Sequence, residues 1–152
     1  MSIKARLEQM GLSLPQAPRP VAAYVPAVRT GNLLFISGQI PFVEGQLKVR
    51  GRCGEDVSLE AAREAARAAA LNGLAVAEAA AGLDRVSRVV KLTGYVASAP
   101  DFFDQPQVVN GASELLVELF GEAGRHARAA VGVSALPLGA PVEIEMVLEL
   151  KD

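Results

Sequence analysis

Hydrophobic and polar residues alternate strictly near the C-terminus of this 152-residue chain. Over residues 141–150, one side of the chain is entirely apolar, while the other carries three glutamates with Val147 between them. A period of two is typical of a strand with one buried and one polar face. The apolar positions are Val142, Ile144, Met146, Leu148 and Leu150, and the acidic ones are Glu143, Glu145 and Glu149. We therefore predict a final strand here whose apolar side joins the core.

The segment 58–81 has the composition of a long helix. About half of its residues are alanine, the best helix former. Ser58 suits the N-cap, and Gly82 suits the position just after the helix end. A second helix is predicted to begin at Asp104-Gln-Pro-Gln107, which resembles a capping box, and to end at Gly121.

Shorter apolar runs predict the remaining elements. Apolar residues three or four positions apart predict a short helix over residues 3–10. An extended arm, whose backbone is restricted by its prolines, follows over 14–20. Strands are predicted over residues 23–29, 33–37, 85–96 and 127–133, with a further short one at 46–49 inside a glycine-rich loop. This order indicates an α+β domain in which two long helices cover one sheet face. The other face must meet water or another subunit. We divide the chain into an extension, 1–20, and one domain, 21–152.

The amino-acid composition excludes several classes of protein. The chain is 51% hydrophobic and 21% charged, with one cysteine, one histidine and a net charge of -2. Disorder, a disulfide framework and a structural zinc site are therefore excluded, and nucleic acid is disfavoured as a partner. No apolar run reaches membrane-spanning length, and charged residues near Met1 interrupt any signal peptide, so we expect a cytoplasmic protein. The Ala, Val and Leu excess favours an oligomer.

Few residues of the chain are candidates for a catalytic or binding role. A lone His126 beside a loop is more typical of a surface residue than of a base, and Cys53 lacks a neighbouring base, which favours a structural role. Arg128 begins a strand of small residues, where it either caps the strand end in water or binds an anion such as a carboxylate. Glu143 either belongs to a solvated face or holds a water or a proton. If their two strands pair as a hairpin, Arg128 and Glu143 fall towards one end of the sheet.

Several stretches together resemble the RidA family, the reactive intermediate deaminases also called YjgF-like or endoribonuclease L-PSP proteins. The signature lies in residues 128–137 (RAAVGVSALP) followed by Val142-Glu-Ile-Glu145. Residues 31–41 (GNLLFISGQIP) resemble the family's early strand and Ser-Gly-Gln turn. Residues 72–83 resemble the family's first long helix and the glycine that ends it. Val109-Asn110 resembles the start of its second helix. The resemblance covers roughly residues 21–150.

The resemblance implies a chorismate-mutase-like two-layer α+β fold with a mixed sheet, assembled as a homotrimer with active sites in clefts between subunits. It further implies hydrolysis of enamine and imine intermediates, such as 2-aminoacrylate, to 2-oxo acids and ammonia without a cofactor. Arg128 matches the arginine that binds the substrate carboxylate, and Glu143 the glutamate near the reacting water. The residues that match the cleft lining are Tyr24, Ser37, Gly38 and Asn110.

This chain departs from the family pattern at several points, which indicates a longer, divergent subgroup. Ala22-Ala23-Tyr24 replaces a Gly-Pro-Tyr run, and Ala130 stands where many members have cysteine. The N-terminal extension and the 44–56 loop are additional. These departures favour one alternative, a trimer that binds small carboxylates or senses a metabolite without catalysis. The resemblance implies a second one, an endoribonuclease or translation inhibitor, because some family members have that activity. The acidic pI of about 5.5 disfavours the second alternative.

Overall fold

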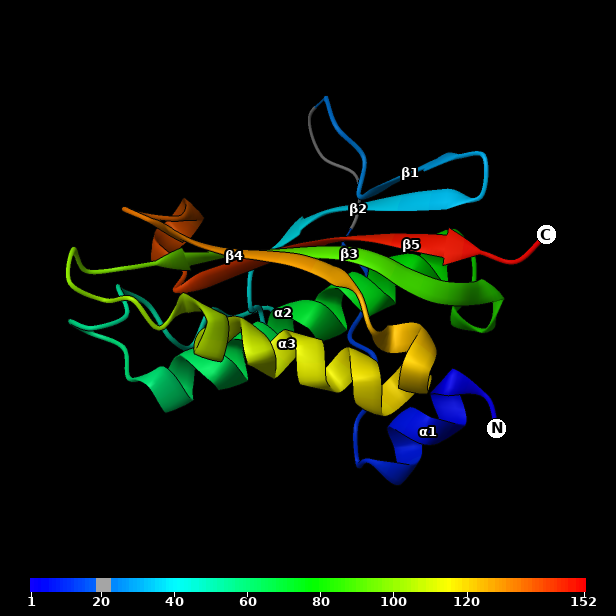
Figure 1. The fold of residues 1–152 in the computed structure, drawn as a ribbon, viewed down its shortest axis with the longest axis horizontal. Helices are drawn as coiled ribbons and strands as arrows, with labels where there is room; N and C mark the ends of the chain where they lie inside the picture. The colour runs from blue at the N-terminus through cyan, green and yellow to red at the C-terminus, as the bar shows by residue number, and fades with distance from the viewer. Residues whose placement is uncertain (19–22) are drawn as a thin grey trace.

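The computed structural model describes residues 1–18 and 23–152, and they form two layers. A five-stranded sheet lies on one side, and two long helices, α2 and α3, cover one of its faces (Figure 1). The α-helices are α1 (Ile3–Gln9), α2 (Leu59–Ala80) and α3 (Gln105–Phe120). The strands are β1 (Ala27–Thr30), β2 (Leu33–Gln39), β3 (Val86–Ala97), β4 (Ala127–Val133) and β5 (Val142–Leu150). The predicted α+β class and the placement of both long helices on one face are confirmed.

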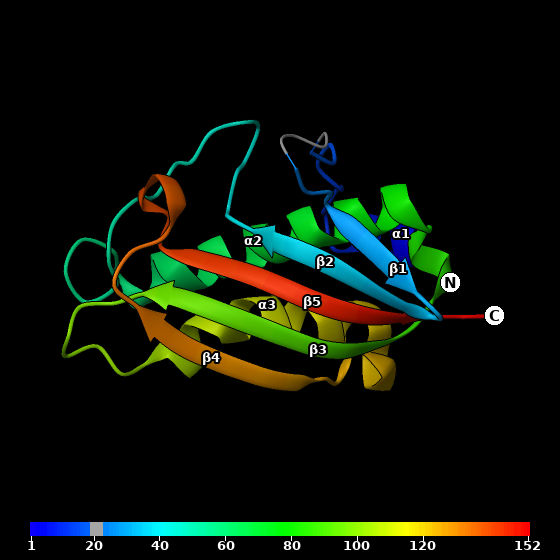
Figure 2. The same ribbon diagram turned by 90° about the horizontal axis from the view of Figure 1, so that it is seen from above.

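The sheet has the order β1-β2-β5-β3-β4, which Figure 2 shows from above. Only β3 and β4 pair in parallel, and the other neighbours are antiparallel, so the sheet is mixed. The last two strands do not form a hairpin, because β3 lies between β4 and β5. The reason is the crossover through α3, which returns the chain in the direction of β3, as a parallel pair requires.

Helix α2 begins and ends where its local sequence predicts. The Ser58 hydroxyl accepts a hydrogen bond of 3.1 Å from the Ala61 N–H, and Gly82 adopts a φ of 88° just past the helix end. The capping box predicted at the start of α3 is wrong, because the Asp104 side chain accepts no hydrogen bond from the first N–H groups of the helix. Asp104 has φ −93° and ψ 31°, outside the extended conformation in which an N-cap side chain reaches the first free N–H groups.

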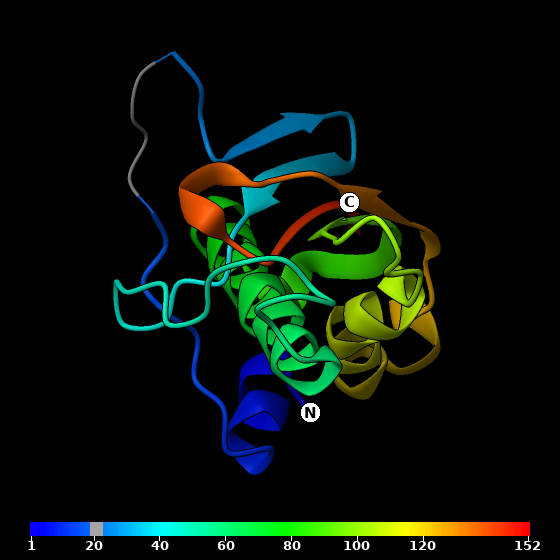
Figure 3. The ribbon, with the colours of Figure 1, turned by 90° about the vertical axis from the view of Figure 1, so that its left-hand side faces the viewer.

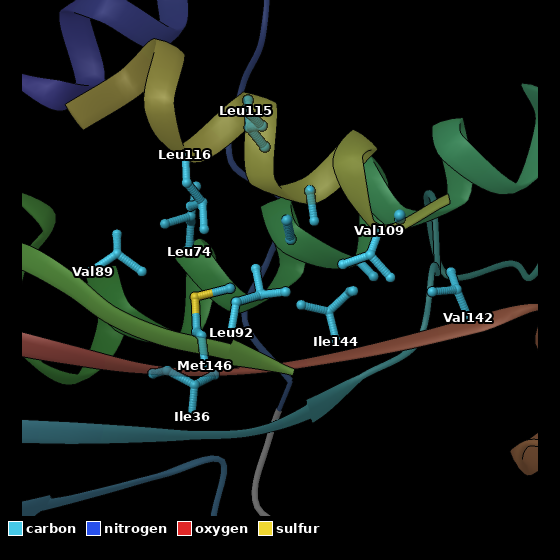
Figure 4. Packing of buried hydrophobic residues seen from close by; sticks show 14 of the residues in the cluster. Ile36, Leu74, Val89, Leu92, Val109, Leu115, Leu116, Val142, Ile144 and Met146 are labelled. Carbon is cyan, nitrogen blue, oxygen red and sulfur yellow. The ribbon is translucent and has the colours of Figure 1, made fainter. Parts of the chain in front are cut away.

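The core lies between the sheet and the two helices (Figure 4). The apolar face of β5 contributes Ile144 and Met146, which meet Leu74 of α2 and Val109 of α3 from the other layer. The alternation predicted for residues 141–150 is confirmed, because buried and half-buried positions alternate along the whole strand. One face of α2 is lined by fully buried alanines, so the helix lies close to its neighbours; they are Ala62, Ala66, Ala69, Ala70 and Ala77.

Two of the predicted strands differ in the structure. The strand predicted over 23–29 is shortened to β1, and Tyr24 and Pro26 precede it as irregular backbone. The strand predicted at 46–49 is wrong, since the glycine-rich loop contains isolated bridges, at Val43, Gln46 and Cys53, in place of a strand. Proline lacks the N–H that a ladder needs, and the glycines turn the loop too often for a continued strand.

The N-terminal segment packs on the ends of the helices. Leu7 of α1 is only 2% exposed and belongs to the core, and Arg6 Nη1 donates a 2.8 Å hydrogen bond to the Leu119 carbonyl. The arm over 12–18 then passes beside the loop after β2, as Figure 3 shows. Residues of the arm and of this loop, with Asn72 of α2, line a cavity of about 750 Å³. Three features expected from the sequence lie outside the described residues. They are the end of the arm at 19–20, the domain start at Val21 and the departure at Ala22. The boundary between extension and domain stays a prediction.

No helix within residues 1–18 and 23–152 is both long and apolar enough to span a bilayer.

Candidate functional site

Arg128 lies near the start of β4, where its side chain contacts α3. Its Nη1 donates a 2.7 Å hydrogen bond to Oδ1 of Asn110 and a longer one, 3.3 Å, to Oγ of Ser113. Asn110 and Ser113 are three residues apart on one face of α3, so both reach the same strand edge. Among the residues that the structure describes, Arg128 forms no ion pair. Its remaining N–H donors are suited to a planar anion such as a carboxylate.

His126 belongs to the same cluster. It is half-buried rather than a free surface residue. Its Nε2 lies 2.9 Å from Oγ of Ser113, and its Nδ1 lies 2.7 Å from the carbonyl oxygen of Gly124. Arg128, Asn110, Ser113 and His126 therefore form one connected group, which we call the arginine cluster.

Glu143 lies on the opposite face of the sheet, beside a cavity of about 250 Å³. Gly38 makes room for it, because a β-carbon on residue 38 would lie 2.5 Å from Oε2 of Glu143. The cavity is lined by Pro18, Tyr24, Pro26, Gly38, Gln39, Ile40, Phe42, Pro137 and Glu143. Burial, and secondarily the charge of Glu145, raises the pKa of Glu143 above its ordinary value. We call this region the glutamate cavity.

Polar groups continue along this face from the glutamate cavity. The Tyr95 hydroxyl donates a 2.7 Å hydrogen bond to Oε1 of Glu145, and this bond, with burial and the nearby carboxylates, raises the pKa of Tyr95. Ser37 donates to the Val25 carbonyl at 2.9 Å and lines an adjacent hollow of about 430 Å³ that also includes Lys91 and Glu145.

A single chain does not bring Arg128 and Glu143 together. Arg128 is the register partner of Leu92, whose buried side chain faces the helices, whereas Glu143 is the partner of Tyr95 on the other face. Register partners project to the same side of a sheet, so the two charged residues point in opposite directions from strands that β3 separates. Asn110 belongs with Arg128, and Tyr24 and Gly38 belong with Glu143.

Cys53 is fully buried, and burial raises the pKa of its thiol to about 11. A thiol that holds its proton so firmly is a poor nucleophile, which agrees with the structural role expected for it. Within residues 1–18 and 23–152, no three His, Cys, Asp or Glu side chains gather as a metal site would require.

Known proteins resemble this chain over almost its whole length. Residues 4–150 match the family described as "YjgF/chorismate_mutase-like, putative endoribonuclease". The chain belongs to this YjgF-like (RidA) family. Protein TCP17 of Trypanosoma cruzi is 44% identical, over 99% of this chain and 95% of that protein. The crystal structure of Atu1372 from Agrobacterium tumefaciens, a protein described as having unknown function, has a TM-score of 0.92 at 46% identity. It covers 98% of this chain and 92% of that one.

One relative in the family carries an activity in its name. A 2-iminobutanoate/2-iminopropanoate deaminase of Dermatophagoides farinae is 33% identical, over 92% of this chain and 95% of that protein. Membership of the family and the chorismate-mutase-like fold expected from the sequence are therefore confirmed. The roles of the six expected site residues stay predictions.

Sequence reasoning missed two members of the arginine cluster and much of the cavity wall. Ser113 is one helical turn beyond Asn110, a spacing that could have indicated a shared partner. The contact of His126 with Ser113 depends on the turn between α3 and β4, which no local pattern specifies. Pro18 and Pro137 both line the glutamate cavity although 119 positions separate them in the numbering.

Proposed function

We propose that this protein hydrolyses enamine and imine intermediates such as 2-aminoacrylate to 2-oxo acids and ammonia, without a cofactor. In the imine form, water adds to the carbon of the C=N bond and gives a carbinolamine. One proton of the water goes to nitrogen in this addition. The new hydroxyl group then gives its proton to nitrogen as the C–N bond breaks, so ammonia leaves with both protons of the water and a 2-oxo acid remains. The imine carbon is already electrophilic, so orientation and modest proton transfer supply most of the required rate enhancement.

Arg128 binds the substrate carboxylate in this proposal. Its Nη1 is directed by Asn110, and it has no carboxylate partner among the described residues, so its other donors are available for a ligand. Guanidinium offers paired donors in one plane, which match the two oxygens of a carboxylate.

Glu143 moves the proton. Its raised pKa lets it hold a proton closer to neutral pH than an exposed glutamate can, so it can take a proton from the attacking water and return it to nitrogen. The glutamate cavity is small and has a largely apolar wall, including Pro18, Pro137 and Phe42, which suits a compact substrate.

The observation that carries the proposal is the separation of Arg128 and Glu143 on opposite faces of one sheet. Both residues act on one small substrate only if they come from different copies of the chain. We therefore propose a homotrimer, with each site between two subunits. The helix-free sheet face favours such a contact, since Val28, Phe35 and Val131 on it are 54%, 43% and 41% exposed.

The test uses purified protein and 2-aminoacrylate produced in the assay by a pyridoxal-phosphate enzyme. We expect faster release of 2-oxo acid and ammonia with the wild type, and a loss of at least about 100-fold in Arg128→Ala and Glu143→Gln. Arg67→Ala and Glu64→Gln are matched controls, since both residues lie on α2, away from the two groups and from the helix-free sheet face. Equal rates in Arg128→Ala and the wild type would overturn the assignment. Saturable carboxylate binding without turnover would instead favour the non-catalytic alternative.

A further inference from the structure

We infer that Ser113 and His126 are positioning residues that hold Arg128 in the orientation for carboxylate binding. This inference rests on the proposed function of Arg128 as the carboxylate ligand. It adds two residues to the site and a defined direction of hydrogen bonding between them.

The contacts of His126 determine which of its nitrogens carries the proton. A backbone carbonyl can only accept a hydrogen bond, so Nδ1, at 2.7 Å from the Gly124 oxygen, must carry a hydrogen. In the neutral imidazole, Nε2 is then the acceptor. The Ser113 hydroxyl, 2.9 Å away, donates its single hydrogen to Nε2.

The same reasoning fixes the role of the Ser113 oxygen. Because its hydrogen is committed to His126, its lone pairs face its other partner among the described residues, Nη1 of Arg128 at 3.3 Å. The chain of hydrogen bonds therefore runs from Arg128 to Ser113, from Ser113 to His126, and from His126 to the Gly124 carbonyl. Together with the bond to Asn110, it gives Nη1 two fixed acceptors.

Gly124 anchors the far end of this chain. It is buried, and a β-carbon on residue 124 would lie 2.3 Å from the Leu116 carbonyl oxygen of α3. Only glycine therefore lets the turn Gly121–Gly124 lie this close to the helix, where its carbonyl faces the ring of His126.

The charges nearby leave Arg128 free for a ligand. Glu114, next to Ser113, pairs with Arg63 at 3.0 Å, and Glu122 pairs with Arg125 at 3.2 Å. An arginine side chain loses much rotational freedom when it binds an anion, so prior restraint of its guanidinium strengthens binding.

The first experiment tests the hydrogen-bond chain without any ligand. His126 is the only histidine of the chain, so the nitrogen-15 resonances of its ring are unambiguous. At pH 8 we expect the Nδ1–H tautomer in the wild type and a shifted Nε2 resonance in Ser113→Ala. A neutral ring with hydrogen on Nε2 would overturn the inference, whatever the protein's activity.

The second experiment measures binding of 2-oxobutanoate by calorimetry. We expect Ser113→Ala and His126→Ala each to weaken binding about three- to tenfold, and Ser113→Thr, which keeps the hydroxyl, to restore it. In kinetics on the imine, Ser113→Ala should raise KM by a similar factor with kcat within about twofold. Ser87→Ala, which removes a hydroxyl bonded to Glu149, serves as the control and should bind like the wild type.

The two hypotheses fail in different ways. If the wild type binds 2-oxobutanoate and Arg128→Ala does not, but Ser113→Ala and His126→Ala bind as tightly as the wild type, only the positioning role is overturned. If the wild type does not bind 2-oxobutanoate, the role of Arg128 fails and the positioning role fails with it.

Discussion

The Glu143 carboxylate occupies the space that a side chain on Gly38 would need. A β-carbon on residue 38 would lie 2.5 Å from Oε2 of Glu143 and 2.9 Å from its Cδ. Both are atoms at the flexible end of a side chain, so Gly38→Ala should displace the carboxylate rather than unfold the sheet. We expect imine hydrolysis to fall at least about tenfold, while the free energy of unfolding changes by less than about 1.5 kcal/mol.

A double-mutant cycle tests whether that loss acts through Glu143. In the Glu143→Gln background, Gly38→Ala should reduce the rate little further, because the displaced group no longer moves a proton. Independent, multiplicative losses measured at both sites would show that Gly38 acts in another way.

The raised pKa of Glu143 predicts that the stability of the folded protein depends on pH. Burial raises its pKa in the folded protein, so the folded state binds the proton more tightly than the unfolded chain does. The stabilisation that follows is complete below the ordinary glutamate pKa of about 4.3, and is lost as the pH rises through the raised value. Between pH 4 and pH 7, wild-type stability should therefore fall relative to Glu143→Gln in urea unfolding. A difference that stays constant would contradict the burial of this carboxyl group.

The close approach of α2 and α3 depends on Gly111. A β-carbon there would lie 2.1 Å from the backbone carbonyl oxygen of Arg63, which cannot move without the whole helix. Gly111→Ala should therefore cost roughly 1–3 kcal/mol or more in unfolding free energy. At Gly73 the nearest atom is the flexible Cε of Met146, at 2.8 Å. Gly73→Ala should therefore cost clearly less, because a side-chain end can move aside, while the helix preference of alanine is the same at both positions. Equal costs in urea titrations would contradict this account.

The N-terminal helix should contribute to the stability of the whole domain. Leu7 is 2% exposed and packs into the common core, so Leu7→Ala should cost about 2–4 kcal/mol. The exposed Glu8→Ala is the matched control and should change stability by less than about 0.5 kcal/mol. A separate, earlier unfolding transition for residues 1–20 would instead favour an extension that folds independently.

Features governed by local chemistry could be predicted from the sequence. Ser58 and Gly82 mark the ends of α2 because capping depends on a few neighbouring backbone groups. The alternation in β5 identifies its buried face without any knowledge of its partners. Asp104 shows the limit of this approach, since its residue type suits a cap but its backbone conformation does not.

Features governed by pairing between distant segments could not be predicted. The sequence contains both Arg128 and Glu143, but which faces they occupy depends on the registers that β3 imposes on β4 and β5. A hairpin of the last two strands would bring them to one end of the sheet, whereas the crossover through α3 separates them. The pairing of His126 with Ser113 likewise depends on how the turn at Gly124 packs on α3.

The central claim is that Arg128 of one chain and Glu143 of another form one active site. Arg128→Ala and Glu143→Gln, each inactive alone, can be co-expressed with different tags so that mixed trimers are isolated. Each mixed trimer has one site of three with both residues intact, so we expect the isolated mixed trimers to have about one third of wild-type activity. Light scattering should give three times the chain mass of 15.9 kDa. Mixed trimers that are no more active than either parent would contradict the claim.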